Sequence, residues 1–226
     1  MTEQNLKSTL LEAAKPHVPF DGWTEVTFRA AQADAKISAG LAKAACPRGA
    51  LDLAVAFHEQ GDAAMEARLN AEDLNHLRYS EKIATAVRFR IEAIEDRELA
   101  RRATTLFALP QNAGDGARLI WGTSDRIWTA LGDTSQDVNW YTKRSILSGV
   151  YGSTLLYWLG DDTPGFEATW AFVDRRINDV MAFEKFKSKI RSNGVMSRML
   201  QGPMSLLDRI RAPGAEAQNF PGRWSR

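Results

Sequence analysis

Cysteine is almost absent from this chain of 226 residues, which contains only Cys46. A single cysteine excludes an internal disulfide and a metal site built from cysteines, and it fits a reducing compartment. No uninterrupted apolar run approaches the roughly 20 residues that a membrane-spanning helix requires. The opening segment MTEQNLKSTLLEAAK shows neither a signal peptide nor an Arg-rich transit peptide, so we expect a cytoplasmic protein.

Sequence signatures of catalysis are also missing. No G-x-S-x-G elbow, P-loop or dinucleotide fingerprint occurs. The chain has three histidines, His17, His58 and His76, and lacks the two Glu-x-x-His pairs of a di-iron bundle. We expect His58 and His76 on helix surfaces. The sequence therefore predicts no enzyme activity, no cofactor and no metal site.

The hydrophobic pattern is helical throughout. Apolar residues recur at intervals of three and four, and few segments alternate with period two. We predict an all-α fold of about ten helices, at 3–14, 23–33, 38–46, 48–60, 71–93, 95–108, 115–131, 135–159, 164–190 and 195–211. Loops are expected at the Gly- and Pro-containing segments 16–22, 109–116, 131–133 and 160–165.

The segment WTEVTFRAAQADAKISAGLAKAACPRGALDLAVAF (23–57) predicts three short helices with tight joints. It resembles the helix-turn-helix head of the TetR family of repressors, although Cys46-Pro47-Arg48-Gly49-Ala50 keeps the end of the family's recognition helix only loosely. DNA binding requires cations that neutralise phosphates, whereas residues 1–60 hold six Lys/Arg against seven Asp/Glu. We therefore expect a repressor-like fold that binds no nucleic acid. A ligand-responsive transcription regulator is the alternative.

Positive charge and apolar residues coincide near the C-terminal end. Residues 184–226 contain nine Lys/Arg and three Asp/Glu, around an apolar stripe with three- and four-residue spacing. This composition predicts a helix at 195–211 that lies in a membrane interface. The residues expected to contact the membrane are Met196, Arg198, Met199, Leu200, Leu207, Arg209, Ile210 and Arg211. In the alternative interpretation, the stripe docks on the protein's own core and the cations face water.

The segment GDTSQDVNWYTKRSILSGVYGST (132–154) concentrates polar and aromatic residues at the start of a predicted helix. In one interpretation, Asp137 caps this helix and Trp140 and Tyr141 fill the core. In the other, the segment is a protein-binding surface, because Trp, Tyr and Arg are enriched in binding hot spots. The residues alone leave both interpretations open.

Residues 125–187 carry a more specific pattern. The motif D-x-N-W-Y-T-[KR]-R, followed by Y-x-x-T and D-x-[ST]-P-x-F-E-x-T-W-x-F, resembles the core of the Coq-nine family of ubiquinone-biosynthesis accessory proteins. The resemblance covers about residues 10–211 and is strongest over 105–187. Because a transit peptide is not visible, the chain resembles a bacterial member.

The resemblance implies a TetR-like homodimer that is not an enzyme, with an apolar pocket for isoprenoid lipid and a surface for the di-iron demethoxyubiquinone hydroxylase. The family's hydroxylase-binding positions correspond here to Ile127, Leu131, Asp137, Trp140 and Tyr141, to which we add Arg144. For the lipid pocket we expect Phe107, Trp121, Tyr157 and Trp170.

We accordingly expect a helix-turn-helix-like part at 1–60, a lipid-binding helical domain at 61–190 and a membrane-contacting tail at 191–226. The predicted function is that of a lipid-binding accessory protein of ubiquinone biosynthesis, on the cytoplasmic face of a bacterial inner membrane. The pocket is expected to accept the polyprenyl tail of a quinone intermediate, or a phospholipid, while the surface at 137–141 docks the hydroxylase.

Overall fold

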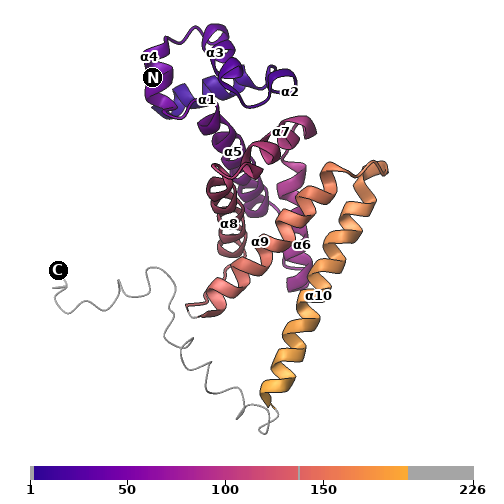
Figure 1. Ribbon diagram of the computed structural model, residues 1–226. Helices are drawn as coiled ribbons and strands as arrows, with labels where there is room; N and C mark the ends of the chain where they lie inside the picture. Colours follow the sequence, from indigo (N-terminus) through magenta and orange to yellow (C-terminus); the bar gives the residue numbers. More distant parts are fainter. Residues whose placement is uncertain (1–2, 137, 193–226) are drawn as a thin grey trace, which may run out of the picture.

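The computed structural model of the protein describes residues 3–136 and 138–192, and the regular structure of this part is entirely helical (Figure 1). The elements are α1 (Glu3–Ala14), α2 (Val18–Asp21), α3 (Glu25–Asp34), α4 (Ala39–Ala45), α5 (Ala50–Ala71), α6 (Tyr79–Glu92), α7 (Arg97–Ala108), α8 (Ala113–Ala130), α9 (Val138–Leu159), the 3-10 helix η1 (Pro164–Phe166) and α10 (Glu167–Ser192). The all-α prediction is confirmed. Across the described residues, none of the helices combines the length and the hydropathy that crossing a membrane requires.

Three helix predictions differ from the structure. The short helix α2 lies in a segment expected to be a loop, and α5 continues to Ala71 instead of ending at residue 60. It continues because Met65 and Leu69 extend its buried face beyond Gly61. The next helix accordingly begins at Tyr79, later than predicted. The boundary expected at residue 60 therefore falls inside α5.

The helices pack around two hydrophobic cores. The upper core in Figure 1 is formed by α1 to α5 with part of α7, and contains Leu10, Phe28 and Leu53. The lower core is formed by the second half of α5 with α6, α8, α9 and α10, and it includes Ala100 of α7. Phe57 on α5 packs against both cores, so this long helix joins the two halves of the described protein.

Helices α9 and α10 run in opposite directions, and the loop between them is ordered by Asp161 (Figure 1). The carboxylate of Asp161 accepts hydrogen bonds from the hydroxyls of Thr163 and Thr169 at 2.7 and 2.6 Å. From α7, Arg97 donates to the backbone carbonyl of Trp158 and Arg101 to that of Leu159, at the C-terminal end of α9. Cations are favourable there because the last carbonyls of a helix have no partner within it. These contacts tie α7 to the end of α9.

Candidate functional site: an apolar cavity beside an aromatic surface

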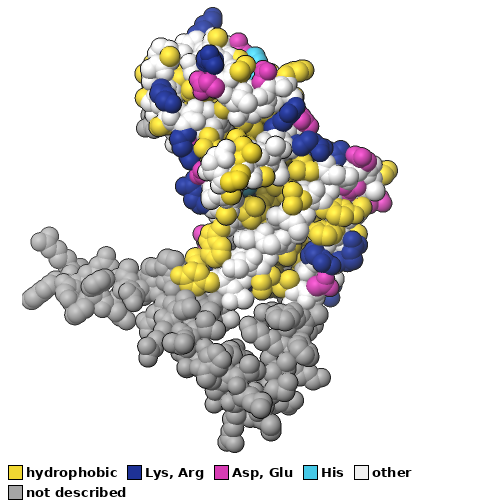
Figure 2. Space-filling view, in the orientation of Figure 1, with side chains coloured by type: hydrophobic (Ala, Val, Ile, Leu, Met, Phe, Trp, Pro, Cys, Tyr) yellow, Lys and Arg dark blue, Asp and Glu magenta, His cyan; other side chains and the backbone are white. Residues whose placement is uncertain are grey.

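A cavity of about 560 Å³ lies among α5, α6, α7, α8 and α9, where the two cores meet. Its wall includes many residues with little or no side chain: Ala64, Ala93, Ala100, Ala103, Ala108, Ala113, Gly116, Ala117 and Gly152. These small residues do not fill the space between the helices that surround the cavity. Figure 2 shows apolar side chains gathered in a band between the N-terminal helices and α9. The volume is that of a small-molecule site.

A buried polar cluster, defined as His58, Asp62, Arg90 and Thr123, adjoins this cavity. Arg90 pairs with Asp62 at 2.5 Å, and each side chain is 3% exposed. His58 Nε2 lies 2.9 Å from the Thr123 hydroxyl, which donates to Asp62 at 2.8 Å. The prediction that His58 lies on a helix surface is wrong, because its side chain is only 12% exposed and bonds within this cluster.

The charges of the cluster are set by burial. Burial, together with the positive charge of Arg90, holds the pKa of His58 well below its ordinary value, so the imidazole is neutral. Burial also raises the pKa of Asp62, although Arg90 opposes this effect. The Asp62–Arg90 pair and a neutral His58 leave the cluster close to electrical neutrality.

The expected pocket residues are only partly in place. Phe107 lines the cavity. The placement of the other three is wrong: Trp121 lies beside Trp140, Tyr157 is 40% exposed, and Trp170 packs on the outside of the lower core. The sequence prediction looked for bulky aromatic groups, whereas the cavity exists where side chains are small.

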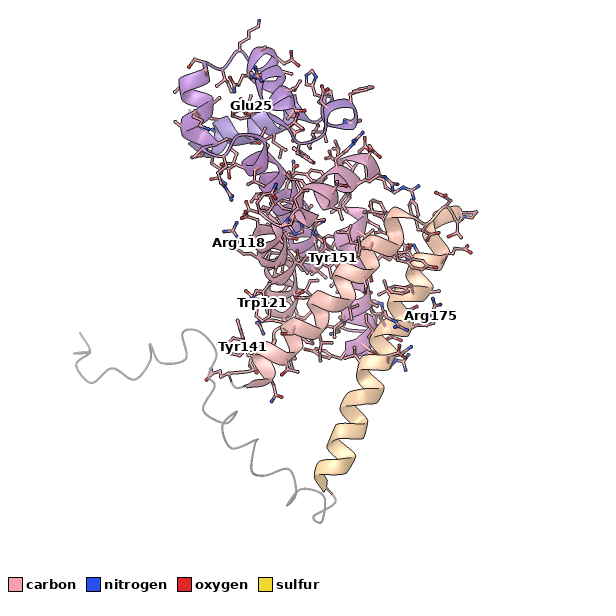
Figure 3. All side chains as sticks on the ribbon, in the orientation of Figure 1. Glu25, Arg118, Trp121, Tyr141, Tyr151 and Arg175 are labelled. Carbon is pink, nitrogen blue, oxygen red and sulfur yellow. The ribbon has the colours of Figure 1, made fainter. Side chains whose placement is uncertain are left out.

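Three aromatic side chains form a second feature, called here the aromatic surface: Trp121 of α8 with Trp140 and Tyr141 of α9. The ring centres of Trp121 lie 5.9 Å from Trp140 and 6.4 Å from Tyr141, and those of Trp140 and Tyr141 are 4.8 Å apart in an edge-to-face arrangement. All three are half-buried. Figure 3 shows Trp121 and Tyr141 close together near the start of α9. Sequence reasoning missed the membership of Trp121, because its neighbours come from another helix.

Ion pairs hold the aromatic surface from inside the protein. Arg144 pairs with Asp125 at 2.6 Å and with Asp133 at 3.1 Å. Lys143 also pairs with Asp133, at 2.6 Å. Burial opposes the ionisation of Asp133, but hydrogen bonds from Lys143, Ser135 and Arg144 outweigh it and lower its pKa to about 2. The loop before α9 is thereby fixed to the helix.

These contacts correct part of the predicted hydroxylase-binding set. Arg144 is 2% exposed and Ile127 is completely buried, so neither is placed to touch a partner directly; both support the surface from within. Leu131 is half-buried and packs against the lower core. Asp137 and the predicted membrane-contacting residues of 195–211 lie outside the described residues. In the part of the chain that the structure describes, no three His, Cys, Asp or Glu side chains gather as a metal site.

Fold and site together define an all-helical protein with an apolar cavity between its helices. A solved TetR transcriptional regulator from Nitrosomonas europaea ATCC 19718 has a similar fold, with a TM-score of 0.63 and 16% sequence identity. The similarity covers 77% of this chain and 97% of that one. At this identity the comparison shows the fold alone, and it confirms the predicted TetR-like architecture.

Sequence comparison gives the family. Residues 113–184 match the COQ9 family. Similar proteins named "Ubiquinone biosynthesis protein COQ9, mitochondrial" occur in Rattus norvegicus (34% identical), Bos taurus (33%) and Homo sapiens (32%), each aligned over 90% of this chain. The chain spans 67%, 65% and 65% of the length of these relatives, respectively. The chain belongs to the COQ9 family of ubiquinone biosynthesis proteins, as the sequence motif predicted.

Proposed function

We propose that this protein is a lipid-binding accessory protein of ubiquinone biosynthesis without catalytic activity of its own. It takes up an isoprenoid quinone intermediate in its cavity and presents it to the demethoxyubiquinone hydroxylase. The observation that carries this proposal is the cavity of about 560 Å³ with its largely apolar wall. Such a wall suits a hydrocarbon-rich ligand, and the few polar groups fix its orientation.

Such a cavity would serve to give a second protein access to the lipid. A lipid that moves from a bilayer into an apolar cavity exchanges one dry environment for another, so it gains little hydrophobic free energy. Binding is therefore easily reversed, as a protein that hands its ligand on requires. The gain is that a reactive ring buried in the membrane becomes reachable by a second protein.

We further propose that the aromatic surface is where the hydroxylase docks, since large aromatic side chains dominate binding hot spots. The surface is close to the cavity along both of its helices. On α8, Ile120 lines the cavity and the next residue, Trp121, belongs to the aromatic surface. On α9, Tyr151 and Trp140 are separated by about 16 Å at the helical rise per residue. A partner bound there lies within reach of the cavity.

Membrane contact through 195–211, which rests on the apolar stripe and the charges of the sequence, and a homodimer, which rests on the family resemblance, complete the proposal. Co-sedimentation with vesicles that contain an anionic phospholipid tests the first. Replacement of Arg209 and Arg211 by Glu is expected to release the protein from these vesicles, because attraction to anionic headgroups is lost. Equal sedimentation of the variant and the original protein would contradict membrane contact by this segment.

Lipid uptake is tested by organic extraction and mass spectrometry of the purified full chain. Isoprenoid lipid is expected to copurify. Ala64→Trp, which places an indole at an exposed position of the cavity wall, is expected to reduce the lipid content. Ala63→Trp is the matched control, because Ala63 is exposed on the same helix and is not part of the wall. An equal lipid content in both variants would contradict the proposed site.

Docking is tested separately. Trp140→Ala is expected to abolish capture of purified demethoxyubiquinone hydroxylase while leaving fold and lipid content intact. Ser145→Ala, at an exposed position one turn further along α9, is the control and is expected to bind normally. Unfolding of the Trp140 variant would return this side chain to a core role.

A further inference from the structure

The cavity wall includes solvent-exposed residues in two groups of different chemistry. In the group on α5 and the loop after α6, the exposed wall residues include Gln60 and Glu95. Both side chains are engaged by α1. Gln60 donates to Glu12 at 3.2 Å, and Lys15 pairs with Glu95 at 2.9 Å. Amide and charged groups therefore line this edge of the cavity, and they do not favour the passage of a hydrocarbon chain.

The second group, on α7, α8 and α9, is apolar. Leu156 of α9 lines the cavity and is nevertheless 61% exposed. Leu109 directly follows the α7 part of the wall and is 42% exposed. Together with the exposed wall residues of α7 and α8, these leucines form what we call the apolar rim: Ala108, Leu109, Ala113, Ala117 and Leu156. Exposed apolar residues that adjoin a cavity are typical of an interaction site.

The charged side chains beside the apolar rim are paired within the protein. One pair comes from α8, one from the start of α5 and one from α7: Arg118–Asp115 at 2.6 Å, Arg48–Asp52 at 2.8 Å and Arg101–Glu98 at 3.1 Å. Each pair contains one cation and one carboxylate, so the three together carry no net charge. Attraction to an anionic partner requires an excess of cations. The apolar rim is therefore suited to an uncharged, apolar partner.

Water limits the routes by which a long lipid can reach the cavity. An isoprene unit has five carbons, and exposing one unit to water lowers the population of that state by roughly a thousandfold. A polyprenyl chain that left a bilayer through water would expose several units at once. An entrance in direct contact with the hydrocarbon of the bilayer avoids this barrier, and such an entrance has to be apolar.

We propose that the apolar rim contacts the surface of a lipid bilayer and forms the entrance through which a lipid moves into the cavity. The inference rests on the proposed function and adds a second membrane contact to it. Leu109 and Leu156 enter the boundary of the acyl chains, while the paired charges beside them stay among the headgroups. This contact differs from the one proposed for 195–211, because it needs no anionic headgroup.

Uptake of ubiquinone with a long polyprenyl tail from phosphatidylcholine vesicles tests the entrance. The purified full chain is mixed with the vesicles, and the quinone that stays with the protein after the vesicles are sedimented is measured over time. Leu109→Glu is expected to slow uptake by roughly ten- to a hundredfold, the value of one buried leucine side chain. Leu109 is not among the residues that line the cavity, so binding of decylubiquinone dispersed in water is expected to stay unchanged. Leu41→Glu, at a 54% exposed position of α4, is the control and is expected to behave as the original protein.

The possible outcomes separate the entrance from other roles of the same residues. Equal uptake rates in Leu109→Glu and the original protein would overturn the entrance, and so would weaker binding of decylubiquinone to this variant, which would place its effect on the cavity itself. Sedimentation velocity tests a second copy of the chain as the partner. A change from dimer to monomer in Leu109→Glu would show that the apolar rim is a subunit interface and not a membrane contact. Failure of the original protein to take up either quinone would instead overturn the proposed lipid-binding function.

Discussion

The guanidinium carbon of Arg144 lies 3.9 Å from the centre of the Trp140 ring. The edge of the same group pairs with Asp125 on α8 and with Asp133 in the loop before α9. A planar guanidinium can do both, because its N–H groups point outward in its plane while its face stacks on an aromatic ring. One buried cation thus joins α8, the loop and the aromatic surface.

Arg144→Lys is accordingly expected to destabilise the protein by about 1–3 kcal/mol, since a lysine cannot satisfy both carboxylates and stack on the indole. Urea unfolding measures the change. Arg175→Lys, at an exposed position of α10, is the control and is expected to change stability by less than about 0.5 kcal/mol. Equal stability of the two variants would show that the Arg144 contacts contribute nothing.

Gly61 is expected to be intolerant of even one added methyl group. A Cβ at this position would lie 2.6 Å from Arg90 Nη1, and Arg90 cannot move away without breaking its buried pair with Asp62. We expect Gly61→Ala to lower the free energy of unfolding by about 3 kcal/mol, in the range for a broken buried pair. Gly149→Ala on α9, where the added Cβ meets nothing within 4 Å, is expected to stabilise by up to about 1 kcal/mol. Thermal unfolding compares the two.

His58 is expected to make stability depend on pH below neutrality. Its pKa is lowered in the folded protein, so between the folded value and about 6.5 the unfolded chain binds the extra proton. Stability therefore falls as the pH decreases from 7 to 5. In His58→Gln this slope is expected to be shallower, whereas His76→Gln, at an exposed position, retains it. The free energy of unfolding is measured with a denaturant at several pH values in this range. An unchanged slope in His58→Gln would show that His58 does not cause the pH dependence of stability.

Asp133 is expected to make the stability of the protein depend on pH in a more acidic range than His58 does. Its pKa of about 2 lies below the ordinary value of 3.8, so its contribution to stability is complete above about pH 4 and is lost as the pH falls toward 2. Asp133→Asn is expected to be less stable at neutral pH and to lose less on acidification. Asp174→Asn, at an exposed position, serves as the reference. Acid titrations that run parallel in both variants would contradict this role.

The helices could largely be predicted because their periodic apolar faces are a local property of the sequence. The wrongly predicted end of α5 shows where prediction from local sequence fails. A glycine in the middle of a helix normally weakens it, but Gly61 is required for the approach of Arg90, which is 29 residues further along the chain and belongs to another helix. Nothing in the neighbouring residues indicates that contact.

The site was less predictable for the same reason. The motif around Trp140 identified the family and one helix of the aromatic surface, but Trp121 joins it only through the packing of α8 on α9. The alanines and glycines that line the cavity come mainly from four helices, α5, α7, α8 and α9, and such residues give no local signal. His58 appeared to be an ordinary surface histidine because its partners, Arg90 and Thr123, are distant in sequence.

The position of the cavity between the two cores affects how the protein unfolds. Phe57 packs against both cores, and Arg97 and Arg101 of α7 contact the end of α9. A lipid bound there, as proposed above, would contact helices of both cores, so its binding free energy would be lost whichever half opened first. The proposed lipid would in this way act as a removable piece of hydrophobic core that couples the unfolding of the two halves.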